Sequence, residues 1–322
     1  MSDRVSTLPR RSLARQRLLT AERYAAPSEP LLSLRRRARL TPGGAAGLLF
    51  VLLLLLTALL GPAVMSTDPQ QQQLRERLLP PAFAGGDWNH PLGTDQLGRD
   101  VLARIIAAAR VSLTVGLTAT AFATLIGVVL GLLAGGLAGR FDRLVSFAVD
   151  VQQALPFVVV AIGVVAVLGP SLLNVIVVLA VTGWVGHARI VRLQTQALRH
   201  AAFVEAARAA GAGPARLLVR HLLPNVTGPI IVIASQQIAG MILYEAALSY
   251  LGLGVPSDTI TWGSMIAGGQ ETLTTAWWIS VFPGCAIAGT ILGFNLLGDW
   301  LQWRWHPAGN RSWKGGSRGM RG

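Results

Sequence analysis

The chain has 322 residues, of which 52% are apolar and only 13% charged, and its formal net charge is +13. Such a high apolar fraction, with the charges confined to a few segments, is typical of a protein that crosses a membrane several times and argues against two soluble domains. The single cysteine, Cys285, excludes a disulfide framework within the chain and a cysteine-based metal site. No segment interleaves aromatic with basic residues, so no nucleic-acid partner is expected.

The chain opens with a predicted arm, residues 1–42, that carries ten arginines up to Leu40. The apolar run 43–62 follows and is long enough to cross about 30 Å of hydrocarbon, which takes ~20 residues of helix. No small-residue cleavage site follows this run. We therefore expect it to remain as the first transmembrane span and not to be removed as a signal peptide.

Residues 63–111 are predicted to lie outside the membrane and to include an amphipathic helix. Thr94 or Asp95 can cap the start of this helix, after which apolar residues recur at helical spacing. Asp100 and Arg104 stand four residues apart, within reach of each other on one side of a helix. His90 is not expected to bind a metal, because no second histidine or cysteine lies near it in sequence.

Five more apolar runs follow, each long enough to cross the hydrocarbon of a bilayer. They are predicted at 112–137, 144–168, 172–191, 226–247 and 279–300. The sequence therefore predicts an all-α polytopic membrane protein with six transmembrane helices, in which 112–302 is the core and 303–322 a tail.

The basic residues predict the orientation of these spans. The arm, the link 138–143, the link 183–225 and the segment after Leu301 together hold 23 of the 28 basic residues. By contrast, 63–111 balances five arginines against five acids, and 249–278 has no basic residue. Because lysine and arginine are enriched on the cytoplasmic side, both termini are predicted to be cytoplasmic.

The segment 199–224 is too charged to cross a bilayer, and its pattern is that of two helices with a turn between them. Helix-forming residues run from Arg199 to Ala210, after which Gly211 suits a left-handed cap and Pro214 suits the first turn of a new helix. The first helix exposes small residues, which would let a partner surface approach closely. The alternative is a surface hairpin that only joins two spans.

The same segment carries a resemblance to a known family. Its Glu-Ala-Ala at 205–207, Gly211 and Leu-Pro at 223–224 have the spacing of the coupling motif of ABC importer permeases. The stretches "HPLGTDQLGRD", "ARVSL", "RHLLPN", "EAALSYLGLG" and "FNLLGDWL" are similar to the second permease subunit of dipeptide, oligopeptide and nickel importers. The resemblance runs from Leu78 to Leu301, with these stretches in the expected order.

This resemblance implies the type I ABC importer permease fold, in the inner membrane of a bacterial cell. It implies pairing with a homologous sister permease, two cytoplasmic ATPases that dock on the coupling helix, and a substrate-binding protein outside. The residues that it assigns to ATPase coupling are Phe203, Glu205, Ala206, Ala207, Gly211, Leu223 and Pro224. It implies no cofactor in this chain, because ATP and Mg²⁺ belong to the ATPases.

One observation from the residues alone agrees with a non-catalytic role. The only lysine is Lys314, and no glycine-rich phosphate-binding loop precedes it. A P-loop requires such a lysine, so the chain is not expected to hydrolyse ATP by that route.

Polar residues within predicted spans are candidates for the translocation path, because they are costly in lipid. These candidates are Asp150, Gln236, Gln237 and Glu245. The alternative for each is a hydrogen bond to a neighbouring helix.

Other functions remain open at this point. Di- and oligopeptides are the expected cargo, while nickel or metal chelates, glutathione-like compounds and some sugars are alternatives within the same permease class. An ion-coupled secondary transporter or channel is an alternative of a different class. An intramembrane serine protease would need Ser171 or Ser264 beside His187, and the predicted topology places both serines on the side opposite the histidine.

Overall fold

The computed structural model describes residues 41–305, except 66 and 257. The predicted arm, apart from its last two residues, and the tail from residue 306 on lie outside this range. Within it the chain is helical, and one isolated bridge between Thr94 and Asp100 is the only β-type pairing described. The helices are α3 (Pro42–Val64), α4 (Val101–Leu137), α5 (Gly139–Ala154), α6 (Phe157–Leu168), α7 (Leu172–Leu198), α8 (Ala202–Ala209), α9 (Pro214–Arg216), the π-helical turn η3 (Leu217–Leu222), α10 (Leu223–Tyr250), α11 (Trp262–Gly269) and α12 (Trp278–Trp305). Short 3₁₀ turns lie at Leu74–Glu76, Ala82–Ala84 and Gln270–Thr272.

Five of the described helical segments are long and apolar enough to cross a membrane, and the pair α5 and α6 makes a sixth if it is counted as one span. This pair is bent by 87°, where a continuous span was predicted at 144–168. The break has a local cause at Leu155 and Pro156. A proline ring disfavours helical angles in the residue before it, and Leu155 is extended, with ψ at 122°.

Helix α4 also differs from the prediction. Its 37 residues join the predicted outer helix and the second span into one element, about 55 Å long at 1.5 Å per residue. It begins at Val101, because the Asp100 side chain caps the helix by accepting a hydrogen bond from the Ala103 amide at 2.6 Å. The predicted caps Thr94 and Asp95 therefore lie ahead of the helix.

Helices α4 and α7 approach each other closely along three glycines of α4 spaced by four residues. A Cβ atom on Gly127, Gly131 or Gly135 would lie only 2.5–2.7 Å from a backbone carbonyl oxygen of α7. Small residues at this spacing are a common way for membrane helices to pack backbone against backbone. The glycine-rich pattern of this span therefore encodes its contact with α7.

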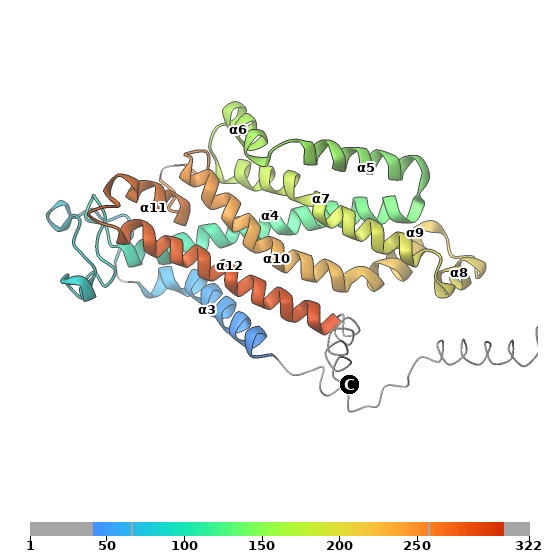
Figure 1. The fold of residues 1–322 in the computed structure, drawn as a ribbon, viewed down its shortest axis with the longest axis horizontal. Coiled ribbons are helices and arrows are strands. Elements are labelled where there is room, and N and C mark those ends of the chain that lie inside the picture. The colour runs from blue at the N-terminus through green and yellow to red at the C-terminus, as the bar shows by residue number, and fades with distance from the viewer. Residues whose placement is uncertain (1–40, 66, 257, 306–322) are drawn as a thin grey trace, which may run out of the picture. The chain divides into compact units, whose positions relative to one another are not determined.

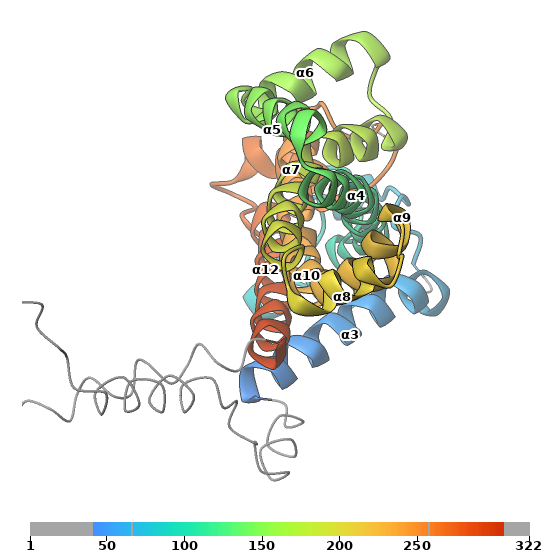
Figure 2. The ribbon, with the colours of Figure 1, turned by 90° about the vertical axis from the view of Figure 1, so that its right-hand side faces the viewer.

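The remaining long helices pack beside this pair. Helix α10 contacts α4, α7 and α12, and α3 lies along α12 (Figures 1 and 2). The Phe50 side chain of α3 packs against Gly289 and Gly293 of α12. The loop 65–100 and α11 gather at one end of these helices, whereas α8 and α9 lie at the opposite end (Figure 1). The two ends are thus built from different segments of the chain.

Candidate functional site

The candidate coupling segment forms a helical hairpin, residues 199–224, between α7 and α10. Helix α8 spans Ala202–Ala209, and the chain reverses at Gly211, whose φ of +84° confirms the predicted left-handed turn. Pro214 stands in the first turn of α9, also as predicted. The hairpin therefore has the two helices and the turn chemistry that the sequence indicates.

Both helix boundaries of the hairpin differ from the prediction. The first helix begins at Ala202, because α7 runs on to Leu198 before the chain turns. The second helix does not end at Leu223 and Pro224: a π-helical turn carries the chain directly into α10. Pro224 therefore lies inside one continuous helical segment, Pro214–Tyr250, where a proline has no N–H to donate to the preceding turn. The π-helical turn η3 directly precedes it.

One side of α8 is fixed to the helices behind it. Val204 is 1% exposed and packs in an apolar cluster that includes Leu132 of α4, Val191 of α7 and Leu218 of η3. A single buried anchor on a helix of eight residues fixes which side faces outward. The hairpin is therefore fixed in orientation against the long helices.

The predicted coupling residues lie mostly on the outward side. Glu205, Ala206, Gly211 and Pro224 are exposed, and the Phe203 side chain is 42% exposed. The remaining two, Ala207 and Leu223, are partly buried. The structure thus presents a surface of small residues flanked by one acid and one aromatic ring.

The four predicted path residues do not come together in one place. Asp150 is exposed on α5, whereas Gln237 donates a hydrogen bond from Nε2 to the Gly183 carbonyl of α7 at 2.9 Å. Gln236 lies against Gly298 of α12. Each glutamine therefore sits at a contact between helices, and a role for these residues in the path remains a prediction.

Glu245 is the most enclosed of the four. Its carboxylate is 0% exposed and accepts hydrogen bonds from Ser112 Oγ of α4 at 2.9 Å and from Ser249 Oγ at 2.7 Å. Buried carboxylates are costly unless they are hydrogen-bonded. Glu245 thus links α10 to α4.

A row of polar contacts between α5 and α7 was not predicted as a site. Asp142 and Arg192 form an ion pair, and Arg189 donates to Gln153 Oε1 at 2.6 Å. Gln152 donates to the Thr182 carbonyl at 2.7 Å and accepts from the Trp184 indole at 2.7 Å. These partners are 30–50 residues apart in sequence, so spacing alone gives no signal for them.

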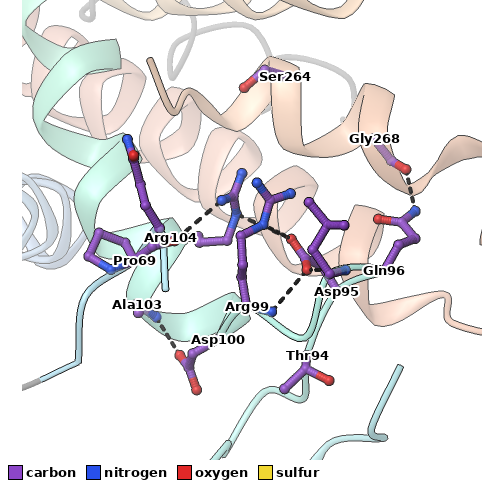
Figure 3. A network of polar contacts seen from close by, with 12 residues as sticks. Pro69, Thr94, Asp95, Gln96, Arg99, Asp100, Ala103, Arg104, Ser264 and Gly268 are labelled. Carbon is purple, nitrogen blue, oxygen red and sulfur yellow. Dashed lines mark hydrogen bonds and ion pairs between the residues drawn. The ribbon is translucent and has the colours of Figure 1, made fainter. Parts of the chain in front are cut away.

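A second polar network joins the loop 65–100 to α4 and α11 (Figure 3). Asp95 pairs with Arg99 at 2.6 Å and with Arg104 at 3.6 Å, both Nε to Oδ2. Gln96 donates to the Gly268 carbonyl of α11 at 2.5 Å. The predicted pair of Asp100 with Arg104 is therefore replaced, because Asp100 is engaged as the cap of α4.

His90 belongs to the same loop and lies between two carboxylates. Its Nδ1 is 2.8 Å from Asp100 Oδ2, and its Nε2 is 3.1 Å from Glu76 Oε2. Burial lowers the pKa of His90, but the two hydrogen bonds and charges outweigh burial, so the net shift is upward from 6.5. The His90 ring therefore ties the loop to the start of α4.

The serines considered for a protease both act as helix caps. Ser171 accepts from the Asn174 amide at 3.1 Å, and Ser264 forms a capping box with Thr261. His187 instead contacts Thr124 Oγ1 at 3.0 Å. Neither serine is placed as a nucleophile beside this histidine.

Two family models match the chain. The model described as "Binding-protein-dependent transport system inner membrane component" covers residues 127–307. The model described as "N-terminal TM domain of oligopeptide transport permease C" covers residues 33–81.

Curated relatives match over most of their length. A di/tripeptide transport system permease protein of Pseudomonas aeruginosa is 40% identical over 81% of this chain and 86% of its own. A dipeptide transport system permease protein of Bacillus subtilis is 39% identical over 80% and 79%, respectively. A glutathione transport system permease protein of Shigella flexneri is 43% identical over 68% of this chain and 72% of its own.

The fold is shared with a solved structure. A chain of the MetNI methionine ABC transporter superposes with a TM-score of 0.53 at 19% identity, covering 63% of this chain and 97% of that one. The predicted all-helical permease architecture is therefore confirmed for the described residues.

Proposed function

This chain belongs to the family of binding-protein-dependent transport system inner-membrane components, and we propose that, as such a permease subunit, it serves an importer of di- or oligopeptides. The relatives named for dipeptide and di/tripeptide transport, at 39–40% identity, support this cargo. The relative named for glutathione transport supports a second candidate of related chemistry, since glutathione is itself a tripeptide.

The hairpin is the element that couples this subunit to ATP hydrolysis in our proposal. The observation that carries it is the coincidence of the Glu-Ala-Ala motif with an exposed small-residue surface, anchored from behind by Val204. The coupling residues are Phe203, Glu205, Ala206, Ala207, Gly211, Leu223 and Pro224. Because the second helix of the hairpin continues through η3 into α10, a displacement of the hairpin can pass into a membrane-spanning helix.

The chain draws its energy from partners in this proposal. ATP and Mg²⁺ belong to the partner subunits in this proposal, which is supported by the lack of a P-loop around Lys314, the only lysine. Two ATPase subunits supply hydrolysis, and closure of the ATPase pair moves the coupling helices together. A binding protein delivers the peptide from the opposite side.

A homologous sister permease completes the path. Exposed apolar side chains on α5, on α6 and in the break between them, including Phe147, Ile162 and Leu155, support burial of this face against the sister subunit or lipid. The candidate path residues Asp150, Gln236, Gln237 and Glu245 come from α5 and α10. Of these, Asp150 has the exposed side chain that a water-filled path between the two subunits requires.

The proposed orientation places the protein in the bacterial inner membrane, with both termini and the hairpin in the cytoplasm. The excess of arginine in the arm, the hairpin and the tail supports it. The loop 65–100 and α11 then face the binding protein.

Reconstitution tests this proposal. The complex of both permeases and the ATPases in vesicles should import a dipeptide when ATP and the binding protein are present, whereas this chain alone should hydrolyse no ATP. Titration of the binding protein with dipeptides, tripeptides and glutathione assigns the cargo. ATP hydrolysis by the isolated chain, or uptake without the ATPases, would refute the proposed role.

A further inference from the structure

A cavity lies beneath the hairpin, on the side of α8 that faces the long helices. Its volume is about 340 Å³, within the range of ~300–1,000 Å³ usual for small-molecule sites. The last turn of α4, the end of α7, α8 and η3 all contribute to its wall. The lining residues are Gly136, Leu137, Arg199, Val204, Arg208, Ala212, Pro214, Leu217, Leu218 and Leu222.

The wall combines two arginines with an otherwise apolar surface. Arg199 follows the last residue of α7, and Arg208 lies in the last turn of α8. Arg199 donates from Nε to His200 Nε2 at 2.9 Å, and no acidic residue lines the cavity. Among the described residues, no salt bridge to a carboxylate is formed by either arginine. The cavity therefore carries positive charge that nothing in its wall offsets.

The surrounding charges do not change this conclusion. The acid of the hairpin, Glu205, lies three residues before Arg208 and about 60° around α8 from it, but it is exposed, does not line the cavity and forms none of the salt bridges of the described residues. Asp142, the acid at the start of α5, forms an ion pair with Arg192, and its charge acts on Arg199 less strongly than on Arg192. Two further arginines, at 216 and 220, add to the positive potential of the hairpin.

We propose that this cavity binds the phosphate of an anionic phospholipid, with Arg199 and Arg208 at the headgroup and the apolar wall against the start of an acyl chain. Arginine pairs with phosphate oxygens in bidentate geometry, and basic pockets between membrane helices at the cytoplasmic surface suit anionic headgroups. A free phosphate would use only the arginines and leave the apolar wall uncovered. A phospholipid would contact both the arginines and the apolar wall.

The position of the cavity connects this lipid to coupling. Val204 and Arg208 lie on one side of α8, whereas Ala206 lies on the opposite side, about 160–200° away. A lipid in the cavity would thus support α8 from behind without covering the surface proposed for the ATPases. The lipid would set how firmly the coupling helix is held.

The inference depends on the proposed function only for the side of the membrane on which the cavity opens. Lipid retention can be measured whether or not the complex transports peptides, so the two proposals can fail separately.

The test uses the full complex extracted from membranes that contain phosphatidylglycerol. Native mass spectrometry should show phosphatidylglycerol retained on the wild type, and retention should fall about tenfold in the Arg199→Gln/Arg208→Gln variant. The matched control, Arg216→Gln/Arg220→Gln, removes the same charge from exposed positions outside the cavity and should retain the lipid.

A second variant separates the apolar wall from the charge. Ala212→Leu fills part of the cavity while keeping both arginines, and it should lose phosphatidylglycerol with the ATPases still bound. This variant decides the question if the double arginine variant fails to assemble. Equal lipid retention by the wild type and Ala212→Leu would overturn the proposal, as would full displacement of the lipid by inorganic phosphate, which indicates a free-anion site.

Discussion

The contact between α4 and α7 offers a sharp test of the packing, through the substitution Gly131→Ala. An added Cβ atom would lie 2.7 Å from the Ala188 carbonyl oxygen, 2.9 Å from Val191 Cβ and 3.1 Å from the Arg192 amide nitrogen. Two of these atoms belong to the backbone of α7 and the third is a Cβ atom, so none of them can move without the helix. The helices must therefore separate for the methyl group to fit.

The cost follows from this separation. A gap of about 0.5–1 Å forfeits a quarter to a half of each van der Waals well along the contact. Overpacking of this kind costs about 1–3 kcal/mol, and the better helix propensity of alanine returns up to about 1 kcal/mol. Relative to an alanine variant that gains only the helix propensity, we expect the free energy of unfolding to be lower by about 1–3 kcal/mol.

The control is Gly163→Ala in α6, where an added Cβ atom has no neighbour within 4 Å. This control should be neutral or more stable, because only the helix propensity changes. Thermal unfolding of the purified chain in one detergent compares the two variants with the wild type. Stability of Gly131→Ala equal to or above that of Gly163→Ala would show that α4 and α7 do not meet along these glycines.

Three further outcomes are expected. The two carboxylates beside His90 raise its pKa, so the stability that His90 adds to the loop 65–100 should be present below about pH 6.5 and lost as the pH rises through the pKa of the folded state. The variant His90→Gln should remove this pH dependence from thermal unfolding. An unchanged pH dependence would exclude His90 as its source. Glu245→Ala should lower the free energy of unfolding by about 2–4 kcal/mol, because two buried serine hydroxyls lose their acceptor. Glu245→Gln should lower it by less. Similar losses for both variants would mean that these hydrogen bonds do not account for the stability. The orientation is tested in a chain with Cys285 replaced by serine. Asn89→Cys should react with a membrane-impermeant thiol reagent added outside intact cells, whereas Ala210→Cys should not. The reverse labelling would contradict the proposed orientation.

Much of the helical framework could be predicted from the apolar runs. The run 43–62 became α3 at Pro42–Val64 and the run 172–191 lies within α7 at Leu172–Leu198, because a membrane span needs only length and hydrophobicity. The break at Pro156 was missed, since both of its arms are apolar and the whole window is long enough for one span. Hydrophobicity reports how much chain can enter the membrane and not where that chain bends.

The polar contacts were harder to predict, because several alternatives satisfy the same spacing. Asp100 and Arg104 stand at helical spacing, but Asp100 caps α4 and Arg104 is drawn to Asp95. The ion pair of Asp142 with Arg192 spans 50 residues and depends on how two helices are placed side by side. Such pairs follow from tertiary structure, which one sequence does not specify.

In the hairpin, too, one feature could be predicted from the sequence and others could not. Its turn at Gly211 could be predicted from local backbone chemistry, since glycine suits a positive φ. Its direction could not, because the buried side of α8 is decided by Val204 reaching a cluster built from α4, α7 and η3. The continuation through Pro224 into α10 was likewise hidden, since a proline within a helical pattern usually predicts that the helix ends before it.

The central claim is that the outward surface of α8 is where the ATPases dock. Ala206→Arg places a long cation at the centre of this surface, whereas Gln302→Arg adds the same group to an exposed position on α12, outside the hairpin. Copurification of the ATPases and ATP-dependent peptide uptake should be measured together for both variants in the reconstituted complex. We predict that Ala206→Arg loses ATPase binding and peptide uptake while the two permeases remain paired, and that Gln302→Arg keeps ATPase binding and uptake. Full ATPase binding and uptake by Ala206→Arg would contradict the assignment of this hairpin as the coupling element.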